Sequence, residues 1–141
     1  MSLPGPHSDL ARKRLTDLRH GLLKLHKALL DSERLSYERT YGRIATRGEF
    51  FQLVIGNEWF GWLHQVSELV VQIDEMLDAE EPVTPVEATK VIDRTRLMLK
   101  PAEEGEGFAK RYFDAMQRDP DVVLAHAAVK KLLRRSAFHL N

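Results

Sequence analysis

Residues 7–81 contain no proline, and this feature constrains the fold of the 141-residue chain more than any other. Proline makes up about 5% of residues in average proteins, so a gap of this length is unusual. The stretch is rich in Leu, Lys, Glu and Arg, which favour helices, whereas proline breaks helix interiors. The chain shows no sustained polar–apolar alternation of the kind that strands need. The sequence therefore predicts an all-α protein.

The first predicted helix runs from about Ser8 to about Tyr41. Its leucines recur at alternating spacings of three and four, which is the pattern of a helix packed in a bundle. A helix of about 30 residues would span about 45 Å, which is long for a 16.2 kDa chain. Either the bundle is elongated or one end of this helix packs on another subunit. The stripe consists of Leu15, Leu18, Leu22, Leu25 and Leu29.

Four local signals divide the rest of the chain into helices. Thr46 to Glu49 fits a capping box that opens a helix. Gly56-Asn57 suggests a break, with Asn57 capping the next segment. Thr84 and Asp119 each precede a proline, which is the order of N-cap and first helical residue. We predict an up-down bundle of four to five main helices, with a long first helix and a second helix broken near Gly56-Asn57.

The chain has 21 basic and 21 acidic residues, which argues against a general polyanion binder. Residues 1–50 carry 10 basic and 6 acidic groups, net +4; residues 51–107 carry 4 and 12, net −8; residues 108–141 carry 7 and 3, net +4. This order suits antiparallel helices whose flanks attract one another. The sharper alternative is that the basic Lys130–Arg135 face of the last helix docks an acidic protein partner.

The absence of cysteine excludes disulfides, thiolate catalysis and cysteine-bound metal centres. No apolar run approaches the about 20 residues of a membrane span, and the N-terminus lacks the pattern of a signal peptide. We therefore expect a cytoplasmic protein that does not enter membranes. Its length predicts a single domain over residues 8–137, with a flexible arm at 1–7 and a tail at 138–141.

The leucine stripe turns polar over the last turns of the first helix. At about 100° per residue, the direction of the stripe continues through Glu33, Ser36 and Thr40. Three interpretations remain open: a satisfied buried network around Glu33, a helix end that outruns the bundle, or a polar ligand pocket. A buried carboxylate needs partners because leaving it unpaired costs several kcal/mol. The candidate ligand-binding residues are Glu33, Ser36, Tyr37, Arg39, Arg43, Trp59 and Trp62.

Motifs for metal, nucleotide or covalent chemistry are weak in this sequence. A di-iron bundle needs inward Glu-x-x-His pairs, and the nearest pattern, Asp17 to His20, lies on the outward side of its helix. His26 and His126 flank core stripes and are the weak candidates for a metal site with Glu33. There is no glycine-rich phosphate loop, and the acidic middle argues against nucleic-acid binding. We expect no cofactor and no catalytic residues.

Four stretches carry a family resemblance: Leu25–Arg34, Trp59–Leu63, Gly107–Tyr112 and Asp119–Val122. With these stretches the chain resembles a family of small all-α bacterial proteins that have no named activity. The similarity covers most of residues 10–135. The resemblance implies a bacterial origin and an all-α fold, and it brings no site residues.

The leading hypothesis is a non-enzymatic helical-bundle protein that acts through protein–protein contacts, as a homodimer. It depends on the long first helix and on an apolar patch, expected at Phe60 and Val71, that lies away from the main stripe of the second helix. The alternative is a bundle that binds a small ligand or a metal in the polar pocket, either as a carrier or as an enzyme. In that hypothesis Glu33 is the general base or metal ligand, and Arg39 or Arg43 holds an anion.

Overall fold

The computed structural model describes residues 6–134, and this part of the chain consists of seven helices without a strand. The predicted all-α fold is confirmed. Residues 1–5 and 135–141 lie outside the described part, so most of the predicted arm, the predicted tail and Arg135 are not described. None of the described helices is long and apolar enough to cross a membrane. The helices are α1 (Pro6–Tyr41), α2 (Arg47–Gly56), α3 (Glu58–Gly61), α4 (His64–Asp78), α5 (Pro85–Met98), α6 (Phe108–Arg118) and α7 (Pro120–Leu133).

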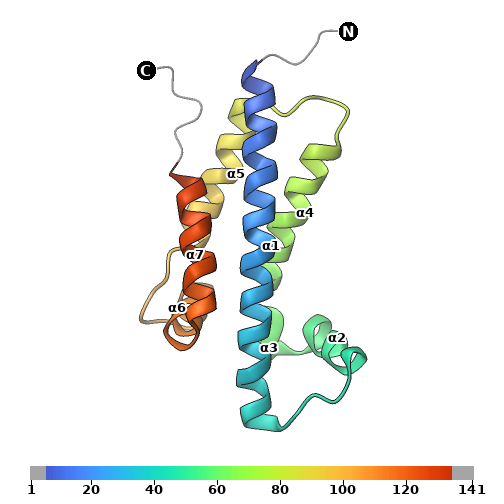
Figure 1. Cartoon of the computed structure of the whole chain (residues 1–141), viewed down its shortest axis with the longest axis vertical. Coiled ribbons are helices and arrows are strands. Elements are labelled where there is room, and N and C mark those ends of the chain that lie inside the picture. Colours follow the sequence, from blue (N-terminus) through green and yellow to red (C-terminus); the bar gives the residue numbers. More distant parts are fainter. Residues whose placement is uncertain (1–5, 135–141) are drawn as a thin grey trace.

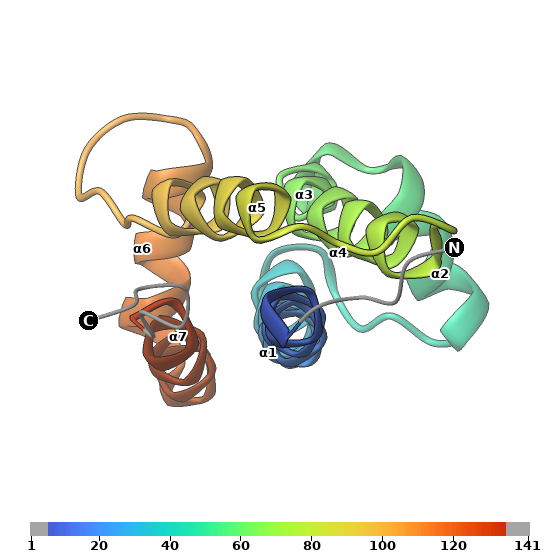
Figure 2. The same ribbon diagram turned by 90° about the horizontal axis from the view of Figure 1, so that it is seen from above.

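Helix α1 is the central element of the fold, and α4, α5 and α7 pack along it (Figures 1 and 2). All five leucines of the predicted stripe, from Leu15 to Leu29, are at most 2% exposed. They face the three surrounding helices because spacings of three and four keep them on one side of α1. The lower end of α1 in Figure 1 carries α2 and α3, which stand beside the main body. The last turns of α1 extend past α4, α5 and α7 (Figure 1) and keep exposed side chains such as Leu35 and Tyr41.

The predicted helix caps are confirmed. The side chains of Thr46 and Thr84 accept hydrogen bonds from the backbone N–H groups of Glu49 and Glu87, both at 3.1 Å. Asn57 caps α3, so the predicted break at Gly56-Asn57 is also present. Gly42 ends α1 with φ of +94°, a left-handed conformation that glycine adopts without steric cost. These local signals work because each supplies an acceptor or a backbone angle that a helix end requires.

The expected exposed patch at Phe60 is wrong. Phe60 is 0% exposed and belongs to the core, whereas Val71 is exposed as predicted. The prediction assumed one uninterrupted helix from residue 59 onward, in which each residue turns by about 100°. The structure has a turn at residues 62–63 between α3 and α4, which resets that phase. An apolar patch formed by Phe60 and Val71 is therefore absent, and it no longer supports a dimer interface.

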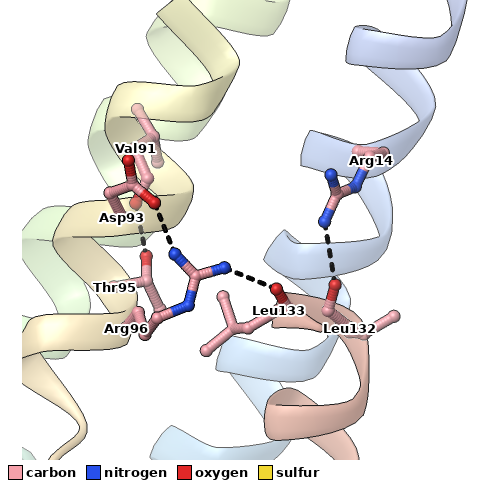
Figure 3. Close-up of polar contacts among 7 residues, drawn as sticks. All are labelled: Arg14, Val91, Asp93, Thr95, Arg96, Leu132 and Leu133. Atoms are coloured by element: carbon pink, nitrogen blue, oxygen red, sulfur yellow. Dashed lines mark hydrogen bonds and ion pairs between the residues drawn. The ribbon is translucent and has the colours of Figure 1, made fainter. Parts of the chain in front are cut away.

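The C-terminal end of α7 is held by arginines from two other helices (Figure 3). The guanidinium of Arg14 on α1 donates to the carbonyl oxygen of Leu132 at 3.0 Å. Arg96 on α5, which also pairs with Asp93, donates to the carbonyl oxygen of Leu133 at 2.6 Å. The last carbonyls of a helix lack partners within the helix and carry partial negative charge. The two arginines thus fix α7 against α1 and α5.

Glycine at position 21 allows α7 to approach α1 closely. A Cβ atom there would lie 3.0 Å from Leu132 Cδ1 and 3.3 Å from Val129 Cγ2. These separations are tighter than ordinary van der Waals contact. The absence of a side chain at Gly21 therefore sets the packing distance between the two helices.

Candidate functional site

The polar end of α1 contains a buried ion pair. Glu33 is only 6% exposed and lies in the direction of the leucine stripe, as the sequence predicted. Arg118, at the end of α6, donates from Nη2 to Glu33 Oε1 at 2.9 Å and from Nε to Ser32 Oγ at 3.0 Å. Glu33 thus belongs to a satisfied network, the first of the three interpretations, and Arg118 supplies the arginine.

A pocket of about 360 Å³ opens beside this ion pair. We call it the charged pocket, because five of its lining residues carry a charge. It lies where the end of α1, the start of α3 and one side of α6 meet. Its volume is within the range of small-ligand sites. The lining residues are Glu33, Ser36, Tyr41, Asn57, Glu58, Trp59, Arg111, Asp114 and Arg118.

A larger pocket of about 650 Å³ lies between the end of α1 and α2. We call it the α1–α2 pocket. Its wall includes one side of α2, where residues 48, 49, 52, 53 and 56 share a helix face. Tyr41 and Asn57 line both pockets, so the two pockets adjoin there. The lining residues are Tyr37, Tyr41, Gly42, Arg43, Ile44, Gly48, Glu49, Gln52, Leu53, Gly56 and Asn57.

The turn between α1 and α2 is held in place by Arg34 and Glu38. Their side chains pair at 3.7 Å, and residues four apart on a helix are neighbours on its surface. The carboxylate of Glu38 also accepts from the backbone N–H of Ile44 at 2.8 Å, and Arg34 lies 4.8 Å above the ring of Phe50. Through Ile44, which lines the pocket, this pair shapes the wall of the α1–α2 pocket.

Aromatic side chains separate the two pockets from the core. Trp59 meets the rings of Tyr37 and Tyr41 edge-on, each at 5.8 Å between centroids. Phe60 packs on Tyr37 from the core side at 5.6 Å. Such tilted and edge-on contacts are favoured by the charge distribution of aromatic rings. The buried indole N–H of Trp59 has no acceptor among the described residues.

Five of the seven predicted ligand-binding residues line a pocket. Glu33, Ser36 and Trp59 line the charged pocket, and Tyr37 and Arg43 line the α1–α2 pocket. The other two line neither pocket. Arg39 is exposed outside both linings, and Trp62 is buried against Phe108.

Sequence reasoning missed several residues of the site. Asn57 and Glu58 adjoin the predicted Trp59, so their position next to the tryptophan was a usable signal. Tyr41 continues the polar end of α1 by one turn beyond Tyr37. Arg111 and Arg118 come from α6, and no local pattern says which helix packs on the end of α1.

The two histidines considered for metal binding lie in separate contacts. His26 Nε2 is 3.0 Å from Ser67 Oγ, and His126 Nδ1 is 2.5 Å from the hydroxyl of Tyr112. Within residues 6–134, no three His, Asp or Glu side chains are grouped so that they could hold a metal ion. Ser67 and His26 line neither pocket, so this pair connects α4 to α1 rather than facing a ligand.

Burial shifts the pKa values of His26, His126 and Tyr112. Burial lowers the pKa of His26 below its ordinary value, and nearby His64 lowers it further. Burial lowers the pKa of His126 as well, with a smaller contribution from Lys130. Burial raises the pKa of Tyr112 far above its usual range, so its hydroxyl stays protonated and can donate to the neutral imidazole.

The fold is expected to lose stability when the pH falls from about 7.5 to about 5.5. Because both histidine pKa values are lowered in the folded state from 6.5, the unfolded chain binds more protons in this window. The free energy of unfolding therefore decreases as the pH falls below 6.5. Urea unfolding at the two pH values measures this change. His126→Gln should weaken the pH dependence, and exposed His20→Gln should leave it unchanged; equal slopes in all three proteins would contradict the assignment.

The comparisons with known proteins return no relative. No protein-family model, no curated protein and no solved structure matches this chain. The resemblance to a small bacterial family, and the bacterial origin that it implies, stay predictions.

Proposed function

We propose that this protein is a non-catalytic binding module that holds a segment of a partner protein in the α1–α2 pocket. The single observation that carries the proposal is that pocket, about 650 Å³ in volume and walled by α2. Its apolar surface comes from Tyr37, Ile44 and Leu53. A pocket of this volume has room for an apolar residue of a docked segment together with its neighbours, while polar groups at the edge orient the segment.

The turn beside the pocket carries three arginines. Arg43 lines the pocket, and Arg39 and Arg47 flank the same turn between α1 and α2 outside the lining. None of the three forms an ion pair within the described part of the chain. The nearby carboxylates of Glu38 and Glu49 are occupied by backbone N–H groups of the turn, at 2.8 and 2.9 Å. Three unpaired guanidinium groups attract carboxylates. The partner segment that fits is therefore acidic, with an apolar residue between its acidic residues.

The outer face of α2 supports a protein partner. Helix α2 has no buried residue, and Phe51 and Ile55 are 61% and 51% exposed. Large exposed apolar side chains beside a pocket are typical of protein interfaces, where aromatic residues are enriched. A partner that reaches the pocket would cover these two side chains.

Selection from a random peptide library on the immobilised protein tests the proposal. We expect enrichment of acidic peptides with an apolar residue, and Arg43→Glu should weaken binding of the selected peptide about tenfold. The matched control is Lys24→Glu, the same charge reversal at an exposed site on α1. Peptides without acidic residues, or equal loss in both variants, would contradict the proposal.

The homodimer predicted from the sequence remains part of this proposal. The loop after α5 carries exposed Glu103, Glu104 and Glu106, which form no ion pair among the described residues. The acidic character of this loop complements the arginines around the turn between α1 and α2, so a second copy of the chain can supply the acidic segment. Light scattering of the unliganded protein distinguishes the cases. A dimer that the Arg43→Glu substitution dissociates identifies the second copy as the occupant of the pocket. A monomer means that the acidic segment belongs to a different protein.

A further inference from the structure

The charged pocket offers a second site, separate from the one proposed for the partner segment. Two of its acidic lining residues, Glu33 and Asp114, already have basic partners, and one of these partners, Lys110, lies outside the lining. Glu33 pairs with Arg118 at 2.9 Å, and Asp114 pairs with Lys110 at 2.8 Å. These side chains hold one another and leave little charge for a ligand.

Two opposite charges of the lining stay unpaired. The side chains of Glu58, on α3, and Arg111, on α6, form no hydrogen bond or ion pair with any described residue. They belong to different helices, so they reach the pocket from different elements. A ligand that meets both must carry a positive and a negative group.

Charge balance disfavours ligands with a single charge. The lining combines three carboxylates with two guanidinium groups, and Lys110 brings the formal sum to zero. The arginines attract an anion and the carboxylates repel it. The carboxylates attract a cation and the arginines repel it. A zwitterion, by contrast, places each group beside its opposite without changing the net charge.

The same pocket also provides an aromatic surface for the uncharged part of a ligand. The rings of Tyr41 and Trp59 contact each other edge-on at 5.8 Å between centroids, and both line the pocket. Aromatic faces bind apolar groups and also attract ammonium groups. The volume of about 360 Å³ suits a molecule of the size of one amino acid.

We propose that the charged pocket binds a small zwitterion of amino-acid size, whose carboxylate pairs with Arg111 and whose ammonium group pairs with Glu58. The body of the ligand packs on Tyr41 and Trp59. Serine 36 and Asn57 supply further hydrogen-bonding groups at the edge of the pocket. The site is independent of the acidic partner segment, although the two pockets adjoin at Tyr41 and Asn57.

Three probes with the same aromatic body test this assignment. Phenylalanine carries both charges at neutral pH, phenethylamine only the ammonium group, and 3-phenylpropionate only the carboxylate. NMR titration of the folded protein at millimolar probe concentration follows the signals of the lining residues and the Trp59 indole. We expect phenylalanine to shift these signals and to bind about three- to fivefold more tightly than either single-charge probe.

Matched variants assign each charge to its partner. Glu58→Gln should reduce binding of phenylalanine and phenethylamine but not of 3-phenylpropionate. Arg111→Gln should reduce binding of phenylalanine and 3-phenylpropionate but not of phenethylamine. Both side chains are exposed, so the fold should persist, and exposed Glu75→Gln on α4 is the control without effect. This selectivity separates a direct contact from a structural role.

Several outcomes would overturn the zwitterion site. They are equal affinities for the three probes, absence of any shift at millimolar concentration, and a loss in Glu58→Gln that is the same for all probes. A shift of the same signals by glucose but not by phenylalanine would assign the pocket to a neutral polyol instead. None of these results bears on the peptide selection with Arg43→Glu, so the two proposals fail independently.

Discussion

Replacing Leu22 by alanine is expected to lower the free energy of unfolding by about 3–5 kcal/mol. Leu22 is 0% exposed and lies in the middle of the leucine stripe of α1. Because α4, α5 and α7 all pack on α1, a cavity at this position weakens the contacts of the central helix with its neighbours. Urea unfolding monitored by circular dichroism measures the change.

The adjacent leucine provides the control. Leu23 follows in the same helix, has the same helix propensity and is 40% exposed. Leu23→Ala should change the free energy of unfolding by about 0.5 kcal/mol or less. Similar losses in the two variants would mean that α1 is not oriented as described here.

Replacing Arg118 by methionine is expected to lower the free energy of unfolding by about 1.5–3 kcal/mol. The Glu33 side chain is 8% exposed, and Arg118, itself 25% exposed, provides its ion pair. Methionine keeps much of the apolar stem but leaves the buried carboxylate without its charged partner. Glu33→Gln should cost less, because the amide oxygen still accepts from the guanidinium. Urea unfolding of both variants gives the comparison.

Lys110→Met is the matched control for this ion pair. Lys110 and Asp114 pair along one side of α6, with side chains 33% and 47% exposed. Exposed pairs of this kind contribute about 0.3–0.5 kcal/mol. If Lys110→Met destabilises the fold as much as Arg118→Met does, burial is not what makes the Glu33 pair important.

The sequence predicted the place of the candidate site and only part of its contents. The leucine stripe stops being apolar at Glu33, and this departure from the pattern marked the end of α1 as unusual. The partner of Glu33 could not be predicted from the sequence. Arg118 lies 85 positions away in the chain, and only the packing of α6 brings it next to Glu33. Arg111 was missed for the same reason, since no periodicity within one helix identifies a neighbour from another helix. Glu58 is a different case, because it adjoins the predicted Trp59 in the sequence.

The error at Phe60 has a different physical origin. A stripe drawn along residues 59–77 assumes one uninterrupted helix, and each added residue advances the face by about 100°. The turn at residues 62–63 changes that phase, so the face computed for Phe60 was incorrect. Hydrophobic periodicity therefore predicts burial well within the long α1 and poorly across a short, interrupted segment.

The sequence by itself determined the all-α fold, most of the helix starts and the buried side of the longest helix. Caps at Thr46, Asn57, Thr84 and Asp119 and the leucine spacing act within a few residues, so they are readable locally. The tertiary structure alone decided which helices meet at the end of α1 and therefore where the two pockets form. That outcome depends on contacts between residues far apart in the chain, such as Glu33 with Arg118, and the geometry of helix packing decides such contacts.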